Sequence, residues 1–91
     1  MLRLMKNNLT DESLKEVIGT LKIIDYLNLA QNGFTDKVFD TLLDFSRIGP
    51  VKSKTVQLGQ NKLNSRKFKE KIDELKKVGI IITLWIYFIT I

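Results

Sequence analysis

The 91-residue chain contains no cysteine and no histidine, and it has one proline and five glycines. The lack of cysteine and histidine excludes disulfides, thiolate nucleophiles, zinc sites built on sulfur or imidazole, and Ser-His-Asp catalysis. The glycines are scattered and form no phosphate-cradling loop. We therefore expect a protein that is not an enzyme, with no catalytic residue, no metal and no cofactor.

Positive charge is concentrated in the second half of the chain, although the formal net charge is only +5. Residues 1–45 hold 5 basic and 7 acidic side chains, whereas residues 46–91 hold 10 basic and 3 acidic ones. Such a surface repels itself unless a polyanion or an acidic partner compensates it. The distribution therefore favours a nucleic-acid-binding protein.

Apolar spacing predicts one small α+β domain with about three helices, a short strand before the third helix and an apolar C-terminal strand. The first helix is expected to start at a Thr10 cap and to run for roughly five turns to Gly33, with close packing or a kink at Gly19. Its apolar face combines positions at steps of three and four residues, namely Leu14, Val17, Ile18, Leu21, Ile24 and Leu27 or Asn28. We identify no internal repeat.

The second helix is expected to follow a Thr35 cap and to end at Gly49 and Pro50. Its predicted buried side consists of Val38, Phe39, Leu42, Leu43 and Phe45. Residues 55–58 are predicted to form the short strand, and the third helix is predicted to run from an Asn64 or Ser65 cap to Gly79. The apolar stripe of that helix contains Phe68, Ile72, Leu75 and Val78.

The hydrophobic tail from Ile80 to Ile91 contains no charge, no glycine and no proline. As a helix it would span about 18 Å, well short of the roughly 30 Å hydrocarbon layer of a membrane. β-Branched and aromatic residues favour a strand instead. Because both faces would be apolar, we expect this strand to be central in a sheet, dimerised or buried against a partner.

Basic residues surround the predicted junction between the short strand and the third helix. The predicted nucleic-acid-binding residues are Arg47, Lys52, Lys54, Lys62, Ser65, Arg66 and Lys67. Free N–H groups at a helix N-terminus attract phosphate, and here the cap is followed at once by Arg66 and Lys67. The stretch from Ser65 to Lys67 is therefore the expected phosphate position.

Three short motifs carry a family resemblance. The first contains Asp36, Val38, Asp40 and Leu42, the second contains Val56, Leu58, Gly59, Asn61, Lys62 and Leu63, and the third contains Leu75, Lys76, Gly79, Ile80 and Ile81. At these spacings the chain resembles the amino-terminal part of the eighth small-subunit ribosomal protein of bacteria and organelles. Gly59 departs from the usual proline, residues 1–34 have no counterpart, and the family's carboxy-terminal RNA-binding domain is missing.

The resemblance implies a structural RNA-binding component of a small ribosomal subunit, in mitochondria or another organelle and otherwise in the cytoplasm. Its partners would be ribosomal RNA and neighbouring ribosomal proteins, with the tail packed against them and no small-molecule substrate. Residues 1–34 would form a helical extension of a basic module at residues 35–91, in one compact domain overall.

Two alternatives remain open from the sequence. The first is a winged-helix DNA-binding regulator, although roughly eighteen residues separate its second and third helices, where such motifs use a short turn. The second is a small interaction or membrane-associated subunit, whose tail docks in a hydrophobic partner and whose basic helix faces anionic lipid.

Overall fold

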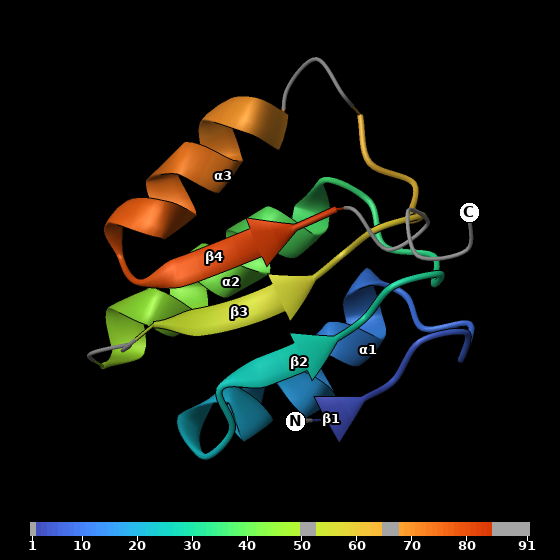
Figure 1. Ribbon diagram of the computed structural model, residues 1–91, viewed down its shortest axis with the longest axis horizontal. Helices are drawn as coiled ribbons and strands as arrows, with labels where there is room; N and C mark the ends of the chain where they lie inside the picture. Colours follow the sequence, from blue (N-terminus) through green and yellow to red (C-terminus); the bar gives the residue numbers. More distant parts are fainter. Residues whose placement is uncertain (1, 50–52, 65–67, 85–91) are drawn as a thin grey trace.

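The computed structural model describes residues 2–49, 53–64 and 68–84 (Figure 1). The elements in chain order are β1 (Leu2–Arg3), α1 (Asp11–Val17), the 3₁₀ helix η1 (Ile18–Lys22), β2 (Tyr26–Asn28), α2 (Lys37–Ile48), β3 (Lys54–Gln57), α3 (Phe68–Lys77) and β4 (Ile80–Thr83). The predicted fold class, a small single α+β domain, is confirmed.

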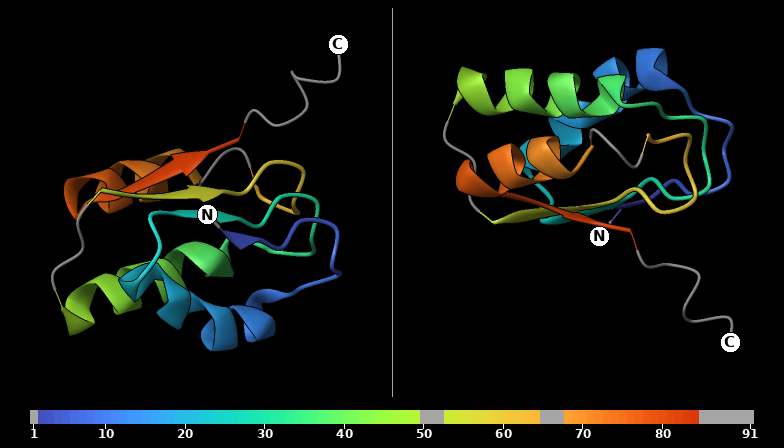
Figure 2. Two further views of the ribbon diagram at one scale, coloured as in Figure 1. Left: turned by 60° about the horizontal axis from the view of Figure 1, so that its bottom comes forward. Right: turned by 90° about the horizontal axis from the view of Figure 1, so that it is seen from above.

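The four strands form one sheet in the order β1-β2-β3-β4, and every neighbouring pair is parallel. Each strand is joined to the next by a helical segment. Figure 2 shows all of these helical segments on the same side of the sheet, and no helix of the described residues covers the other side. Sheet order follows chain order, which is the arrangement of a solenoid in which each unit stacks on the one before it.

The strand register divides the chain into repeating units. Leu2 lies opposite Leu27, Leu27 opposite Val56, and Val56 opposite Ile82. Equivalent units therefore begin at these four residues and span residues 2–26, 27–55 and 56–81, with a fourth starting at Ile82. Their first eight residues are LRLMKNNL, LNLAQNGF and VQLGQNKL. The expectation that the chain has no internal repeat is wrong.

One hydrophobic core lies between the sheet and the helices. The strands contribute alternate residues such as Leu27, Val56 and Ile80, and the helical side contributes fully buried residues such as Leu14 and Phe39. The predicted buried side of α2 is confirmed at all five positions, Val38, Phe39, Leu42, Leu43 and Phe45.

On α3 the predicted core stripe holds only in part. Leu75 is buried, and Phe68 and Ile72 are half-buried against the core. Val78 was predicted to belong to this stripe, but it lies beyond the last helical residue and is 40% exposed. Gly79 follows with a φ of 91°, a left-handed conformation that suits a residue without a side chain and ends the helix as predicted.

The first helix is shorter than predicted. Thr10 is its N-cap as expected, but the helical segment ends at Lys22, and residues 26–28 form β2 between β1 and β3. Leu27 fits a helical spacing from Ile24 and also the alternating pattern of a strand with Leu29. Hydrogen bonding to two neighbouring strands decides in favour of the strand.

Gly19 lies in η1, where a Cβ atom would meet nothing within 4 Å, so the expected close packing there is absent.

The remaining corrections concern α2 and the two ends of the chain. The N-cap of α2 is Asp36, not Thr35. Residues 1–34 were expected to be a helical extension, but they contribute β1, α1 and β2 to the common sheet and core. In the described part of the chain β4 pairs with β3 alone, so of the three arrangements expected for this strand the central position in a sheet is not observed. Pro50 and residues 85–91 of the predicted tail lie outside the described residues.

Candidate functional site

Strands β1, β2 and β3 are each followed by the same tight turn. The residue that precedes the asparagine of each unit has a positive φ, at Lys6 (59°), Gln31 (57°) and Gln60 (57°). The backbone N–H of Lys6 donates to the carbonyl oxygen of Ala30 at 3.2 Å, and that of Gln31 donates to Gly59 at 2.9 Å. The turn therefore repeats in its hydrogen bonds as well as in its conformation, and it directs the chain from the sheet towards the helical side.

The asparagines that follow these turns, Asn7, Asn32 and Asn61, form a ladder along the solenoid. Asn32 Oδ1 accepts hydrogen bonds from the backbone N–H groups of Asn7 and Leu9, both at 2.9 Å. Its Nδ2 donates to the carbonyl oxygens of Leu4, Leu29 and Ala30 at 3.0, 3.0 and 3.1 Å. Asn32 therefore satisfies backbone groups in its own unit and in the preceding one.

Asn61 repeats this arrangement one unit later. Its Oδ1 accepts from the backbone N–H of Phe34 at 3.0 Å, in the preceding unit. Its Nδ2 donates to Leu29 in the preceding unit and to Leu58 and Gly59 in its own, at 3.0, 3.0 and 3.3 Å. The equivalent position of the fourth unit is Tyr87, which lies outside the described residues.

A second set of contacts joins the units four residues after each asparagine. The Asp11 carboxylate accepts hydrogen bonds from the backbone N–H of Thr35, at 3.1 and 3.3 Å, and from its hydroxyl, at 2.6 Å. Asp36, the equivalent residue of the next unit, accepts from the backbone N–H of Asn64 at 2.8 Å. Thr35 was predicted to cap α2; its hydroxyl accepts a hydrogen bond from the backbone N–H of Lys37 at 3.3 Å and also donates to Asp11.

The sequence matches no known family model, no curated protein and no solved structure. The repeated pattern itself is informative. L-x-L-x-x-N-x-L, in units of one strand and one helical segment, is similar to the leucine-rich repeat, whose units have roughly 20–29 residues. Val56, Leu58, Asn61 and Leu63, which carry much of the ribosomal resemblance, belong to this pattern and have counterparts in the preceding unit.

The open face of the sheet carries two rows of side chains that run across the strands. Tyr26, Thr55 and Ile81 form one row, and Arg3, Asn28, Gln57 and Thr83 form the other. We call these seven residues the open face. Their position on this face is explained by the alternation of side chains along a strand, because the residues beside them on each strand point into the core. The sequence analysis missed them, although the positions beside each L-x-L leucine would have identified them once the repeat was recognised.

The open face is almost without charge, because Arg3 is the one charged residue in its two rows. Gln57, in the middle, is 2% exposed and accepts a hydrogen bond at Oε1 from the backbone N–H of Gly59 at 2.9 Å. Ile81 is 39% exposed. The Thr83 hydroxyl is buried and has no hydrogen-bond partner among residues 2–49, 53–64 and 68–84. The Gln57 side chain and the Thr83 hydroxyl are thus not accessible to a partner, and the face can offer mainly apolar contact rather than charge.

Of the predicted nucleic-acid-binding residues that the structure describes, Arg47 and Lys54 lie at the end of the sheet where the strands start, and Lys62 lies at the other end. Lys54 begins β3 and pairs with Asp25 at 2.9 Å, with its side chain 12% exposed. Arg47 is at the end of α2 and pairs with Asp44 at 3.0 Å. Lys62 is exposed and follows the turn after β3, at the opposite end of that strand from Lys54. The other four, Lys52, Ser65, Arg66 and Lys67, lie outside the described residues.

The acidic side chains of α2 are engaged with cations. Asp40 approaches Lys71 of α3 at 3.6 Å, and Asp44 pairs with Arg47. Within the described ranges no cluster of three or more acidic residues could hold a metal ion. None of the helices in those ranges is long and apolar enough to cross a membrane.

Proposed function

We propose that this chain is a leucine-rich-repeat module that binds a protein partner on its open face. The observation that carries the proposal is the difference between the two sides of the sheet. All helical segments cover one side (Figure 2), whereas parallel sheets are ordinarily covered on both. Stacked repeats of this kind present such a surface as a binding site.

The chemistry of the open face suits a polypeptide. Interface centres are depleted in charged residues and enriched in tyrosine, and the row of Tyr26, Thr55 and Ile81 has this character. The strands are about 4.8 Å apart, so this row presents three contacts to a partner that crosses the strands. Tyr26 and Ile81 supply apolar area, and Thr55 between them supplies a hydroxyl.

The expectation of a ribosomal, RNA-binding protein stays a prediction, supported by the net charge of +5 and by the family resemblance. The winged-helix alternative has less support. Strand β3 lies between α2 and α3 in the chain, and the described strands are all parallel. These two helices therefore do not form the helix-turn-helix pair that reads a DNA groove.

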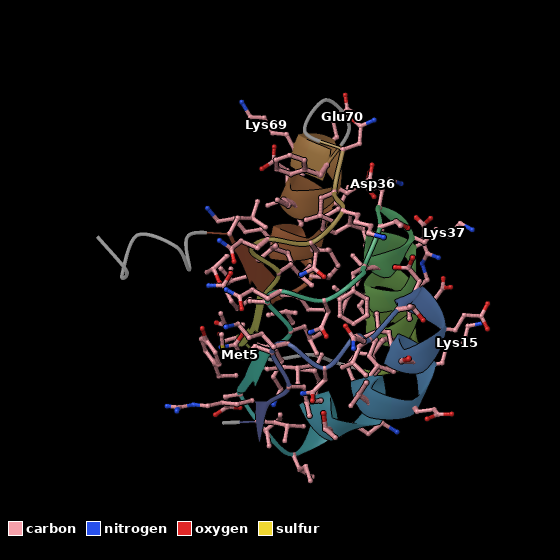
Figure 3. The ribbon with its side chains drawn as sticks, turned by 90° about the vertical axis from the view of Figure 1, so that its right-hand side faces the viewer. Met5, Lys15, Asp36, Lys37, Lys69 and Glu70 are labelled. Carbon is pink, nitrogen blue, oxygen red and sulfur yellow. The ribbon has the colours of Figure 1, made fainter. Side chains whose placement is uncertain are left out.

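Photo-crosslinking in cells of the source organism tests the proposal. p-Benzoylphenylalanine replaces Thr55 at the centre of the open face, or Lys15 on α1 as a matched control on the helical side (Figure 3). We expect a discrete protein adduct from position 55 and none from position 15. Addition of Tyr26→Ala should reduce the adduct at least tenfold, because an interface tyrosine contributes on the order of 2 kcal/mol.

Two results would overturn the proposal. One is equal crosslinking from positions 55 and 15. The other is an adduct at position 55 that nuclease digestion removes, since this would place RNA rather than a protein on the open face and would support the ribosomal prediction.

A further inference from the structure

The three turns that lead from a helical segment into a strand share one sequence feature. At the end of each helical segment that leads into such a turn, a basic residue is followed directly by a β-branched aliphatic residue, as in Lys22-Ile23, Arg47-Ile48 and Lys77-Val78. The aliphatic side chains are strongly exposed, at 85% for Ile23, 75% for Ile48 and 40% for Val78. We call these six residues the helix-to-strand rim.

The rim lies along one edge of the molecule. Because the strands are parallel, all of them start at the same end of the sheet. Figure 1 shows the ends of α2 and α3 and the starts of β2, β3 and β4 together at the left. The basic-aliphatic pair is therefore presented once per unit along a single edge.

Local structure explains the basic residues of the rim but not its exposed aliphatic residues. A basic residue in the last turn of a helix complements the helix dipole, which accounts for Lys22, Arg47 and Lys77. A single exposed aliphatic residue needs no explanation. Three of them at equivalent turns of one edge, two at 75% exposure or more, contribute little to the core.

The charge at the rim is positive. Asp25 pairs with Lys54, and Asp44 pairs with Arg47. Lys22 and Lys77 are exposed and form no ion pair within the part of the chain that the structure describes, and Lys76 beside Lys77 is in the same situation. The surface therefore complements an anionic partner.

We infer that the helix-to-strand rim docks on an anionic lipid surface. The cations would contact headgroup phosphates while Ile23, Ile48 and Val78 enter the boundary between headgroups and acyl chains. Side chains exposed at 75–85% project from the surface instead of lining a groove. A lipid interface accepts such separate projections without a matching shape, whereas a peptide would have to supply a pocket for each. The inference is independent of the proposed function, because the rim is at the end of the sheet and leaves the open face accessible.

Co-sedimentation of the full chain with vesicles tests the inference. We expect binding to vesicles of phosphatidylcholine with phosphatidylserine, and little binding to phosphatidylcholine alone. Each rim lysine near the surface contributes about fivefold to the affinity, so Lys22→Glu with Lys77→Glu should weaken binding at least 25-fold, to order of magnitude. The matched control is Lys37→Glu with Lys69→Glu, which makes the same charge change at the opposite edge (Figure 3) and should weaken binding only slightly.

Substitution of the aliphatic residues provides a second test, which leaves the charge of the protein unchanged. Ile23→Ser with Ile48→Ser should remove the binding that persists at high salt, where charge attraction is screened. Far-UV circular dichroism verifies that each variant is folded. Equal losses from the two lysine pairs, equal binding to neutral vesicles, or no vesicle binding would overturn the inference. Rim-dependent binding to poly-glutamate or to an RNA homopolymer, without vesicle binding, would assign the rim to another class of polyanion.

Discussion

Asn32 and Asn61 both donate a hydrogen bond from Nδ2 to the carbonyl oxygen of Leu29, each at 3.0 Å. Asn32 belongs to the same unit as Leu29, and Asn61 belongs to the next one. A single backbone carbonyl therefore uses its two lone pairs to join successive repeats. The same two asparagines accept hydrogen bonds from the backbone of the preceding unit, so the ladder holds the turns of the solenoid together.

Asn32→Ala should be much more destabilising than Asn7→Ala. The first change removes the acceptor of two backbone N–H groups and one donor from three carbonyl oxygens, of which Leu29 keeps Asn61 and Ala30 keeps the N–H of Lys6. We expect the free energy of unfolding to fall by about 2–4 kcal/mol, mainly through the two N–H groups. The Asn7 side chain donates one hydrogen bond, to Met5 at 3.2 Å, and is exposed, so its loss should cost under about 1 kcal/mol. Urea denaturation of the two variants provides the comparison, and equal losses would show that the ladder contributes no stability.

Asp11 and Thr35 should be energetically coupled across their unit boundary. Asp11→Ala removes an ionised acceptor from a backbone N–H and a hydroxyl, and we expect a loss of about 1–3 kcal/mol in unfolding free energy. A double-mutant cycle with Thr35→Val measures the hydroxyl part of this interaction. Glu12→Ala, in the same first turn of α1, is the matched control and should cost only a few tenths to about 1 kcal/mol. Additive effects of Asp11→Ala and Thr35→Val would contradict the coupling.

A β-branched residue in the turn before Asn61 should lower the stability of the protein. Gln60 has a φ of 57°, a region in which β-branched side chains are strained. Gln60→Val should therefore lower the unfolding free energy by about 1–3 kcal/mol. Gln60→Gly should cost much less, because glycine accepts this φ and the one side-chain hydrogen bond that is lost, from Gln31 Nε2 to Gln60 Oε1, is exposed to solvent. Thermal unfolding of the two variants tests this, and similar melting temperatures would mean that the turn relaxes out of the left-handed conformation.

The sequence alone was sufficient to predict α2, β3 and α3, in the second half of the fold. Val38, Phe39, Leu42 and Leu43 recur at helical spacing over the whole of α2, and this helix is long enough for the pattern to be unambiguous. Strand β3 and helix α3 lie where the short strand and the apolar stripe of the third helix were predicted. In these segments local preference and tertiary contacts favour the same structure.

Strand β2 and the repeat were missed for a common physical reason. A strand of three residues is too short to show alternation by itself, and the spacing from Ile24 to Leu27 continues the helical pattern of α1. The units also differ in length and replace leucine by Val56 and Phe34. Each turn alone consists of common residues, and only the equivalence of Asn7, Asn32 and Asn61 identifies them. The residues of the open face are defined by their positions within the repeat, so they could not be predicted until the repeat was recognised.

The asparagine ladder has a direction, because Asn32 and Asn61 each supply partners to the unit before them. The backbone N–H of Leu9 is satisfied by Asn32, and that of Phe34 by Asn61. When the chain is synthesised from its N-terminus, the first turn cannot be completed until residue 32 has emerged from the ribosome, nor the second until residue 61 has. Folding of this protein therefore trails its own synthesis by about one repeat.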